Sequence, residues 1–229
     1  MLKLEQLSLT QGEFRLSADW SAQAAGIVAL LGPSGAGKST LLSVIAGFLA
    51  PRSGRVLWND VDITPLDPGS RPVSMLFQDN NLFPHLTVTQ NVALGRTQGL
   101  RLSKDDLSAA EQQLSRVGLE GYGARKPGAL SGGQQSRAAL ARILMQEKPL
   151  VLLDEPFAAL GPALKEEMLD LVAAVLADKL ILMVTHDPND ARRSADRVSV
   201  VANGLASEPR DVRRVFNDPP PALREYLGS

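Results

Sequence analysis

Residues 32–40, GPSGAGKST, have the types and spacing needed to bind phosphate. They fit the pattern G-x-x-x-x-G-K-[ST], with Gly32, Gly37, Lys38 and Ser39 at the fixed positions. Glycines let several backbone N–H groups point at one anion, and the following helix adds the positive end of its dipole. We expect Lys38 to reach the β- and γ-phosphates of a nucleotide and Ser39 to bind Mg²⁺. The residues predicted to contact the nucleotide are Gly32, Pro33, Ser34, Gly35, Ala36, Gly37, Lys38, Ser39 and Thr40.

Two acids, Asp154 and Glu155, follow the apolar run at residues 150–153. Ligands bind at the carboxyl ends of parallel strands, so Asp154 would lie beside the glycine-rich loop and hold Mg²⁺ through water. Glu155 would polarise an attacking water as a general base. The alternative is a solvated pair that caps the next helix, and the phosphate loop in the same chain favours the functional interpretation.

Gln78 and His186 also stand at the ends of expected strands, in MLFQDNN and LMVTH. The amide of Gln78 could bind Mg²⁺ or sense the attacking water, although an ordinary loop glutamine is the alternative. The imidazole of His186 could donate a hydrogen bond to the γ-phosphate. The other histidine of the chain, His85, lies in an expected loop and is interpreted as structural.

A second glycine-rich stretch, LSGGQQSR at residues 130–137, precedes an apolar helical pattern. By itself it is compatible with a linker that caps a helix or with a second anion-binding nest. The loop at 32–40 already accounts for binding of the chain's own nucleotide, so a second nest would have to serve a different function.

Composition limits the classes of protein. The chain has 229 residues, 44% apolar and 21% charged, which suits a packed core. A net charge of −1 with scattered Lys and Arg argues against nucleic acid as a partner, and the lack of cysteine excludes disulfides and thiolate chemistry. The N-terminus does not resemble a signal peptide, and the longest apolar stretch, 171–184, is too short to span a bilayer. We therefore expect a soluble, cytoplasmic protein that reaches a membrane only through a partner.

Apolar runs alternate with helical patterns, which predicts a mainly parallel α/β sheet. The N-terminal strands would form an antiparallel β add-on, a helical insert would occupy 86–148, and the Pro-rich end NDPPPALREYLGS is expected to be peripheral. Strands are expected within 2–20 (two, turning at Gln11-Gly12), at 26–32, within 53–64 (a hairpin turning at Asn59-Asp60), and at 71–78, 150–156, 180–186 and 197–204. Helices are expected at 39–48, within 86–148 apart from loops at 95–104 and 118–130, and at 163–177.

The order of these motifs resembles the ATP-binding-cassette (ABC) ATPase family over nearly the whole chain, and LSGGQ is that family's signature. The resemblance implies a P-loop NTPase (RecA-like) fold, hydrolysis of ATP, and ATP and Mg²⁺ as cofactors. It implies one ABC ATPase domain over 1–229, with a nucleotide-binding core at 1–85 and 149–206, a helical signature subdomain at 86–148 and a C-terminal tail at 207–229.

The resemblance also gives the second glycine-rich stretch a purpose. In the family, two subunits pack head to tail, and each signature caps the ATP held by the other subunit's loop. A homodimer is therefore expected. Its signature residues acting in trans would be Ser131, Gly132, Gly133 and Gln134, its catalytic residues Glu155, His186 and Gln78, and its metal-binding residues Ser39, Gln78 and Asp154.

Residues 71–95 and 130–144 are most similar to ATPase subunits of bacterial importers, particularly those that import thiamine (vitamin B1). This implies transmembrane permease subunits as partners, indirectly a periplasmic solute-binding protein, and no nucleic acid. The subunit would lie peripherally at the cytoplasmic face of the inner membrane, with the Gln78 loop and the insert as docking surface. The substrate rests on the resemblance alone, so another small solute or ion, such as iron or a polyamine, is the alternative cargo.

Three positions depart from the family pattern. Gln135 and Ser136 follow the signature where a basic residue and Gln are usual. Gln11 stands where an aromatic residue that stacks on adenine is expected, which leaves Phe14 as the candidate. Gly161 replaces an Asp that reaches toward the opposite subunit. As the residue before Pro162 it is biased toward extended backbone, and glycine also tolerates positive φ.

Other ABC classes fit less well. DNA-repair and chromosome-organising ATPases generally need long coiled coils or zinc modules, and this chain has neither heptads nor cysteine. Translation-associated ABC proteins carry two cassettes, and this chain carries one. A non-catalytic regulatory cassette is disfavoured because Glu155 and His186 are intact.

Overall fold

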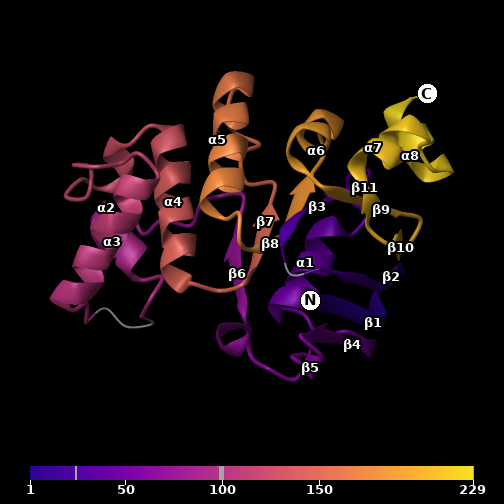
Figure 1. Ribbon diagram of the computed structural model, residues 1–229. Coiled ribbons are helices and arrows are strands. Elements are labelled where there is room, and N and C mark those ends of the chain that lie inside the picture. Colours follow the sequence, from indigo (N-terminus) through magenta and orange to yellow (C-terminus); the bar gives the residue numbers. More distant parts are fainter. Residues whose placement is uncertain (24, 98–100, 229) are drawn as a thin grey trace. The chain divides into compact units, whose positions relative to one another are not determined.

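The computed structural model describes residues 1–23, 25–97 and 101–228, which form two compact units (Figure 1). Unit 1 consists of Met1–Val73, Pro149–Asp154 and Asp178–Ser229, and unit 2 consists of Ser74–Lys148 and Glu155–Ala177. The predicted helical insert at 86–148 falls inside unit 2. The predicted loop at 95–104 includes residues 98–100, which lie outside the described residues.

The centre of unit 1 is a parallel sheet made from the apolar runs. β3 (Gly26–Leu31) lies between β8 (Leu180–Thr185) and β9 (Arg197–Ala202), and β7 (Leu150–Asp154) pairs with β8. Every residue of β8 is buried, as expected for a strand covered on both faces. The prediction of a mainly parallel α/β sheet is therefore confirmed.

The N-terminal strands form the predicted antiparallel part of unit 1. β1 (Leu2–Gln11) pairs with β2 (Phe14–Ala22) and β4 (Ser53–Trp58), and β4 pairs with β5 (Val61–Asp62). The short strand β10 (Leu205–Ala206) joins this part to the parallel centre, because it pairs with both β2 and β9.

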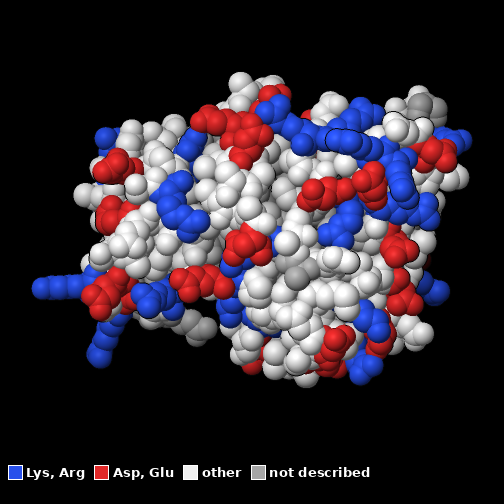
Figure 2. All heavy atoms as spheres, viewed as in Figure 1, with Lys and Arg blue, Asp and Glu red and all other residues white. Residues whose placement is uncertain are grey.

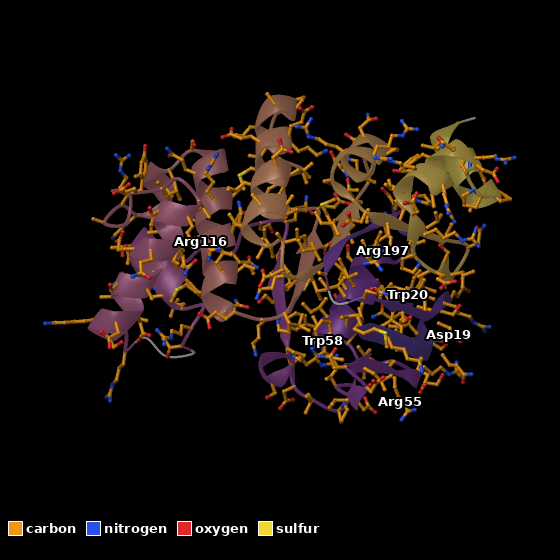
Figure 3. All side chains as sticks on the ribbon, in the orientation of Figure 1. Asp19, Trp20, Arg55, Trp58, Arg116 and Arg197 are labelled. Carbon is orange, nitrogen blue, oxygen red and sulfur yellow. The ribbon has the colours of Figure 1, made fainter. Side chains whose placement is uncertain are left out.

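The hairpin between β4 and β5 turns where the sequence predicts. Asn59 and Asp60 have φ of 49° and 63°, the pair of left-handed residues that a type I′ turn requires. Trp20 of β2 and Trp58 of β4 are both buried in this part of unit 1 (Figure 3). Together with the buried leucines of β1 and β2, these large side chains form the apolar face of the antiparallel strands.

The predicted strand at 71–78 is shorter in the structure. β6 spans Val73–Leu76, and Pro72 cannot donate an N–H to a ladder. Gln78 therefore lies two residues beyond the strand rather than at its end.

The described residues of unit 1 form the α-helices α1 (Lys38–Ala46), α6 (Pro188–Ser194), α7 (Val212–Asn217) and α8 (Pro221–Leu227), with a 3-10 turn at Pro68–Ser70 and the short β11 (Arg210–Asp211) ahead of α7. Figure 1 shows α7 and α8 in yellow at the C-terminal end. In the Pro-rich end at 217–229, predicted to be peripheral, Leu223 of α8 is buried, whereas Pro221, Arg224 and Glu225 are exposed. Proline at the first position of α8 starts that helix rather than preventing it.

Unit 2 contains α2 (Val88–Ala93), α3 (Lys104–Arg116), α4 (Gly132–Gln146) and α5 (Pro162–Val175), of which α2, α3 and α4 pack on one another (Figure 1). The first three begin with a capping box, in which the N-cap hydroxyl and the N3 side chain satisfy each other's backbone N–H. The pairs are Thr87 with Gln90, Ser103 with Asp106, and Ser131 with Gln134. Each helix start is therefore fixed locally.

Among the described residues, no helix is long and apolar enough to cross a membrane. Acidic and basic side chains alternate over the face shown in Figure 2. Lys and Arg gather over the region of α6 and α7, with Asp and Glu among them.

Candidate functional site

The glycine-rich loop connects β3 to α1 as the motif predicts. Lys38 is buried, at 6% exposure, and its ammonium donates to the carbonyls of Gly32 and Pro33 at 2.8 Å each. Gly35 and Gly37 have φ of 77° and 98°, which turns their N–H groups in a way that other residues rarely allow. The loop is thus a folded cradle with a cation held inside it.

Sheet register brings further predicted residues to this loop. Leu31, which precedes the loop, pairs with Thr185, and Asp154 pairs with Val184. The loop, Asp154 and His186 therefore all follow or end neighbouring parallel strands at one edge of unit 1. The hydroxyl of Ser39 donates to Asp154 Oδ1 at 2.7 Å across 115 residues of sequence.

His186 begins the turn after β8 and its side chain is exposed. The residues on either side of it are held firmly. Thr185 Oγ1 donates to the buried carboxylate of Asp190 at 2.5 Å and accepts from the Asp187 N–H at 3.0 Å. Asp187 in turn caps α6 by accepting from the Asn189 N–H at 2.9 Å.

Phe14 lies against the phosphate loop. A Cβ placed on Gly37 would collide with the ring of Phe14, so this glycine is needed for close approach as well as for its positive φ. Gln11 pairs with Phe14 across the hairpin, and its side chain is exposed. The position of Phe14 supports it as the aromatic residue nearest the loop, and its stacking on adenine stays a prediction.

Glu155 directly follows Asp154 and is the first residue of its segment in unit 2. Its φ is 45°, a left-handed conformation that non-glycine residues adopt at a cost and that clusters at functional sites. Its carbonyl accepts from the Ala158 N–H at 3.3 Å, and Phe157 beside it is buried. A buried anchor and a tight turn therefore maintain the unusual backbone of Glu155.

The loop after Gln78 is clamped to α4 within unit 2. Asn80 and Asn81 have φ of 56° and 47°, and the guanidinium of Arg142 donates to their carbonyls at 2.8 and 2.7 Å. The Asn80 side chain donates to Ser136 Oγ at 3.3 Å. Burial lowers the pKa of Arg142, but an arginine keeps its charge at neutral pH.

The signature residues form the first turn of α4. Gln134 N donates to Ser131 Oγ at 3.4 Å, and Ser131 N donates to Gln134 Oε1 at 3.0 Å. Gly133 is buried, and a Cβ there would lie 2.6 Å from Leu164 of α5. Ser131 and Gly132 are exposed, and the first N–H groups of a helix have no acceptor within it. Binding of an anion from outside the chain at this turn stays a prediction.

The residues that depart from the family pattern have structural partners that sequence reasoning missed. Gln135 Nε2 donates to the carbonyls of Pro127 and Leu130 at 3.2 and 3.3 Å, which ties the preceding loop to α4. Ser136 is buried and receives the bond from Asn80. Gly161 is the N-cap of α5 with φ of −65°, so positive φ is not the reason for glycine there.

Arg71 is a further residue that the sequence did not single out. It is 2% exposed and donates to the carbonyls of Val44 and Ile45, at the end of α1, at 2.7 and 2.9 Å. It also donates to the carbonyls of Thr64 and Leu66 at 2.7 and 3.0 Å. Burial lowers its pKa. Arg71 therefore caps the helix that begins at the phosphate loop.

The structure brings together Lys38, Ser39, Asp154 and the start of the His186 turn within unit 1. Gln78, Glu155 and the signature turn belong to unit 2. Roles of the predicted site residues toward a nucleotide stay predictions.

A parallel sheet with a phosphate loop, an acid at the end of the next strand but one, and an LSGGQ helix start define a P-loop ATPase of the cassette type. The family model described as "ABC transporter" matches residues 17–158, and the chain belongs to this family.

Two relatives extend this to the full chain. One, from Cereibacter sphaeroides (strain ATCC 17023), is 58% identical over 100% of both chains, and one from Ruegeria sp. (strain TM1040) is 55% identical over 100% of both. Each is named "Thiamine import ATP-binding protein ThiQ".

Solved structures agree on the fold. The dimeric post-hydrolysis structure of the ATP-binding cassette MJ0796 with ADP and Pi has a TM-score of 0.78 and 30% identity, and covers 93% of this chain and 99% of that one. The ADP conformation of MJ1267, an ABC transporter cassette, has a TM-score of 0.87 and 26% identity, and covers 100% and 99%. The predicted ABC ATPase fold is therefore confirmed.

Proposed function

We propose that this chain is the ATP-binding and ATP-hydrolysing subunit of a bacterial ABC import complex for thiamine. The observation that carries the proposal is 58% identity, over the whole of both chains, to a thiamine import ATP-binding protein. The folded phosphate loop, with buried Lys38 and the bond between Ser39 and Asp154, supplies the chemistry such a subunit needs.

The residues present fit Mg²⁺. The hydroxyl of Ser39 and the carboxylate of Asp154 are hard oxygen ligands within 2.7 Å of each other. Among the described residues, no group of three or more His, Cys, Asp or Glu could hold a metal ion alone. This agrees with Mg²⁺ rather than opposing it, because that ion uses one or two protein ligands together with substrate phosphates. When bound, the ion supplies charge neutralisation on the phosphates.

The chain's own residues then divide the work. Lys38 holds the β- and γ-phosphates, and its pairing with the carbonyls of Gly32 and Pro33 keeps the ammonium aimed into the loop. Glu155 accepts a proton from the attacking water, and its left-handed backbone sets the direction in which the side chain leaves the main chain. His186 donates a hydrogen bond to the γ-phosphate, and Gln78 binds Mg²⁺ or senses the attacking water.

The homodimer is proposed to be head to tail. Ser131, Gly132 and Gly133 would donate to the γ-phosphate held by the other subunit, since Ser131 and Gly132 are exposed and the N–H groups of this turn lie at the positive end of the helix dipole. Gln134 supports the turn through its capping bond to Ser131. Permease subunits would dock on the Gln78 loop and the helices of unit 2, and a periplasmic solute-binding protein would deliver the cargo. The subunit would work at the cytoplasmic face of the inner membrane.

The test is transport by the complex reconstituted with its permease subunits in liposomes. Labelled thiamine should accumulate only with ATP, and unlabelled iron or polyamine should not compete. Accumulation of iron or a polyamine instead of thiamine would reject the proposed cargo and keep the ATPase.

Glu155→Gln tests the mechanism in the same liposomes. Loss of a positioned general base should lower hydrolysis by about 10²–10⁴ while ATP still binds. A Glu155→Gln complex that hydrolyses ATP at the wild-type rate would remove Glu155 from this role.

A further inference from the structure

The C-terminal helix α8 contacts the turn that carries His186. The phenolic hydroxyl of Tyr226 donates to the backbone carbonyl of His186, across 40 residues of sequence and within unit 1. Tyr226 is half-buried, and its ring belongs to a helix that the sequence alone gave no functional role.

Helix α8 is anchored well enough to hold that hydroxyl in place. Leu223 is fully buried, and Arg224 pairs with Asp218 at 2.9 Å. The preceding helix α7 is fixed as well. Its buried Val215 lies in the core of unit 1, and the guanidinium of Arg192 in α6 lies 4.4 Å from the ring centre of Phe216. The donor to His186 therefore stands on a packed element.

The contact acts on the peptide that orients the imidazole. On one side of His186, Thr185 is tied to Asp190, and on the other, the Asp187 N–H is tied to Thr185. These bonds fix the two neighbours. Tyr226 fixes the carbonyl of His186 itself, so the backbone from which the imidazole projects is held at its own peptide as well as at both neighbours.

We propose that Tyr226 is a positioning residue for His186, so that α8 sets the geometry of ATP hydrolysis. The inference rests on the proposed function, because it requires His186 to act on the γ-phosphate. A group that must meet a phosphate within hydrogen-bond distance loses efficiency when its backbone moves by a fraction of an ångström.

The first test is the full chain in the assembled transporter, with Tyr226→Phe against the matched control Tyr122→Phe. These are the chain's two tyrosines, and the ring of Tyr122 in unit 2 stacks with Arg125. Tyr226→Phe keeps the ring and removes the hydrogen bond to the His186 carbonyl, so kcat should fall about two- to tenfold with KM for ATP little changed. Tyr122→Phe should behave as the wild type. A wild-type kcat in Tyr226→Phe overturns the inference.

The second test separates positioning from general stability. In a His186→Ala background, Tyr226→Phe should cause no further loss of kcat, because the residue through which it acts is gone. The same fold loss in both backgrounds overturns the inference. Wild-type hydrolysis by His186→Ala would reject the role of His186 in the proposed function. An impaired His186→Ala with an unaffected Tyr226→Phe would reject only the role of Tyr226.

The two histidines give a direct readout in the isolated chain. With labelled histidine, Tyr226→Phe should shift or broaden the side-chain resonance of His186 and leave that of His85 unchanged. His85 serves as an internal reference because it lies in unit 2, where its ring contacts Phe83. Identical His186 resonances in both proteins would overturn the inference.

Discussion

The phosphate loop of unit 1 and the signature turn of unit 2 are both glycine-rich helix starts, but they are held in different ways. The phosphate loop depends on partners far along the chain, since Ser39 bonds Asp154 across 115 residues. The signature turn is held by its own capping box, whose two partners are only three positions apart in the sequence. Lys38 is buried inside its loop, whereas Ser131 is exposed. The first arrangement is complete within one chain, and the second presents its N–H groups outward, as a site for another subunit's ligand would.

The largest expected effect tests whether the signature turn serves the nucleotide of another subunit. Lys38→Ala and Ser131→Arg should each lower hydrolysis by about 10²-fold or more as pure proteins. Mixed one to one, they should recover about a quarter of the wild-type rate, because half of the dimers form with one intact composite site of two. ATPase rate of the mixture is the measurement. A mixture as inactive as its components would mean that Ser131 serves its own chain's nucleotide.

A large stability effect is expected at Arg71, which caps α1 from a distant loop. Arg71→Met removes four bonds to carbonyls and leaves them buried, so the free energy of unfolding should fall by about 2–4 kcal/mol. Denaturant unfolding measures the change. Arg55→Met is the matched control, since Arg55 is exposed and pairs with Glu5 at the surface, and its midpoint should stay near the wild type. Equal effects at the two positions would contradict the capping role.

A smaller effect is expected at Arg142, the clamp of unit 2. Lysine keeps the charge but cannot present two nitrogens to the carbonyls of Asn80 and Asn81. Arg142→Lys should cost about 1 kcal/mol of stability and make the ATPase less responsive to the permease, measured as stimulated over basal rate. Arg116→Lys, at an exposed position on α3, is the control. Full stimulation in Arg142→Lys would mean that the clamp is structural only.

The smallest effect is expected at Gly161. Nothing lies within 4 Å of a Cβ placed there, and φ of −65° suits any residue. Gly161→Asp should therefore fold normally and stabilise α5 by a few tenths of a kcal/mol as an N-cap, roughly. If the missing carboxylate loosens communication between two ATP sites, the ATPase rate or the Hill coefficient of the assembled transporter should also rise. No change in either would leave Gly161 as a turn residue alone.

Structure is predicted best from the sequence where it depends only on residues within the segment itself. Apolar runs predict β3, β7 and β8, and Asn59-Asp60 predicts the hairpin, because local burial and local φ determine them. The motif at 32–40 predicts the path of the phosphate loop, because the positive φ of Gly35 and Gly37 and the carbonyls that accept from Lys38 lie within it, although the bond from Ser39 to Asp154 is long-range.

Long-range partners were not predictable. In the sequence, Arg71 is an ordinary charged residue before a proline. Only the folded chain shows that it caps the C-terminal end of α1. The burial of Leu223 in a Pro-rich end and the bonds of Gln135 and Ser136 depend on elements distant in sequence or on a loop of irregular shape. Such contacts carry no periodicity that a sequence could display.

The close approach of Gly133 to Leu164 also has a mechanical meaning. A Cβ at this position would lie 2.6 Å from Leu164, so glycine lets the signature turn pack directly against the start of α5. The segment from Glu155 to Gly161 leads directly into α5, so it is connected to the contact between Leu164 and Gly133. In the proposed head-to-tail pair, one chain's Glu155 and its signature serve opposite nucleotides. A displacement of Glu155 would then be transmitted to the signature turn of the same chain, or the reverse. The contact of Gly133 with Leu164 would in this way couple the two nucleotide sites of the dimer.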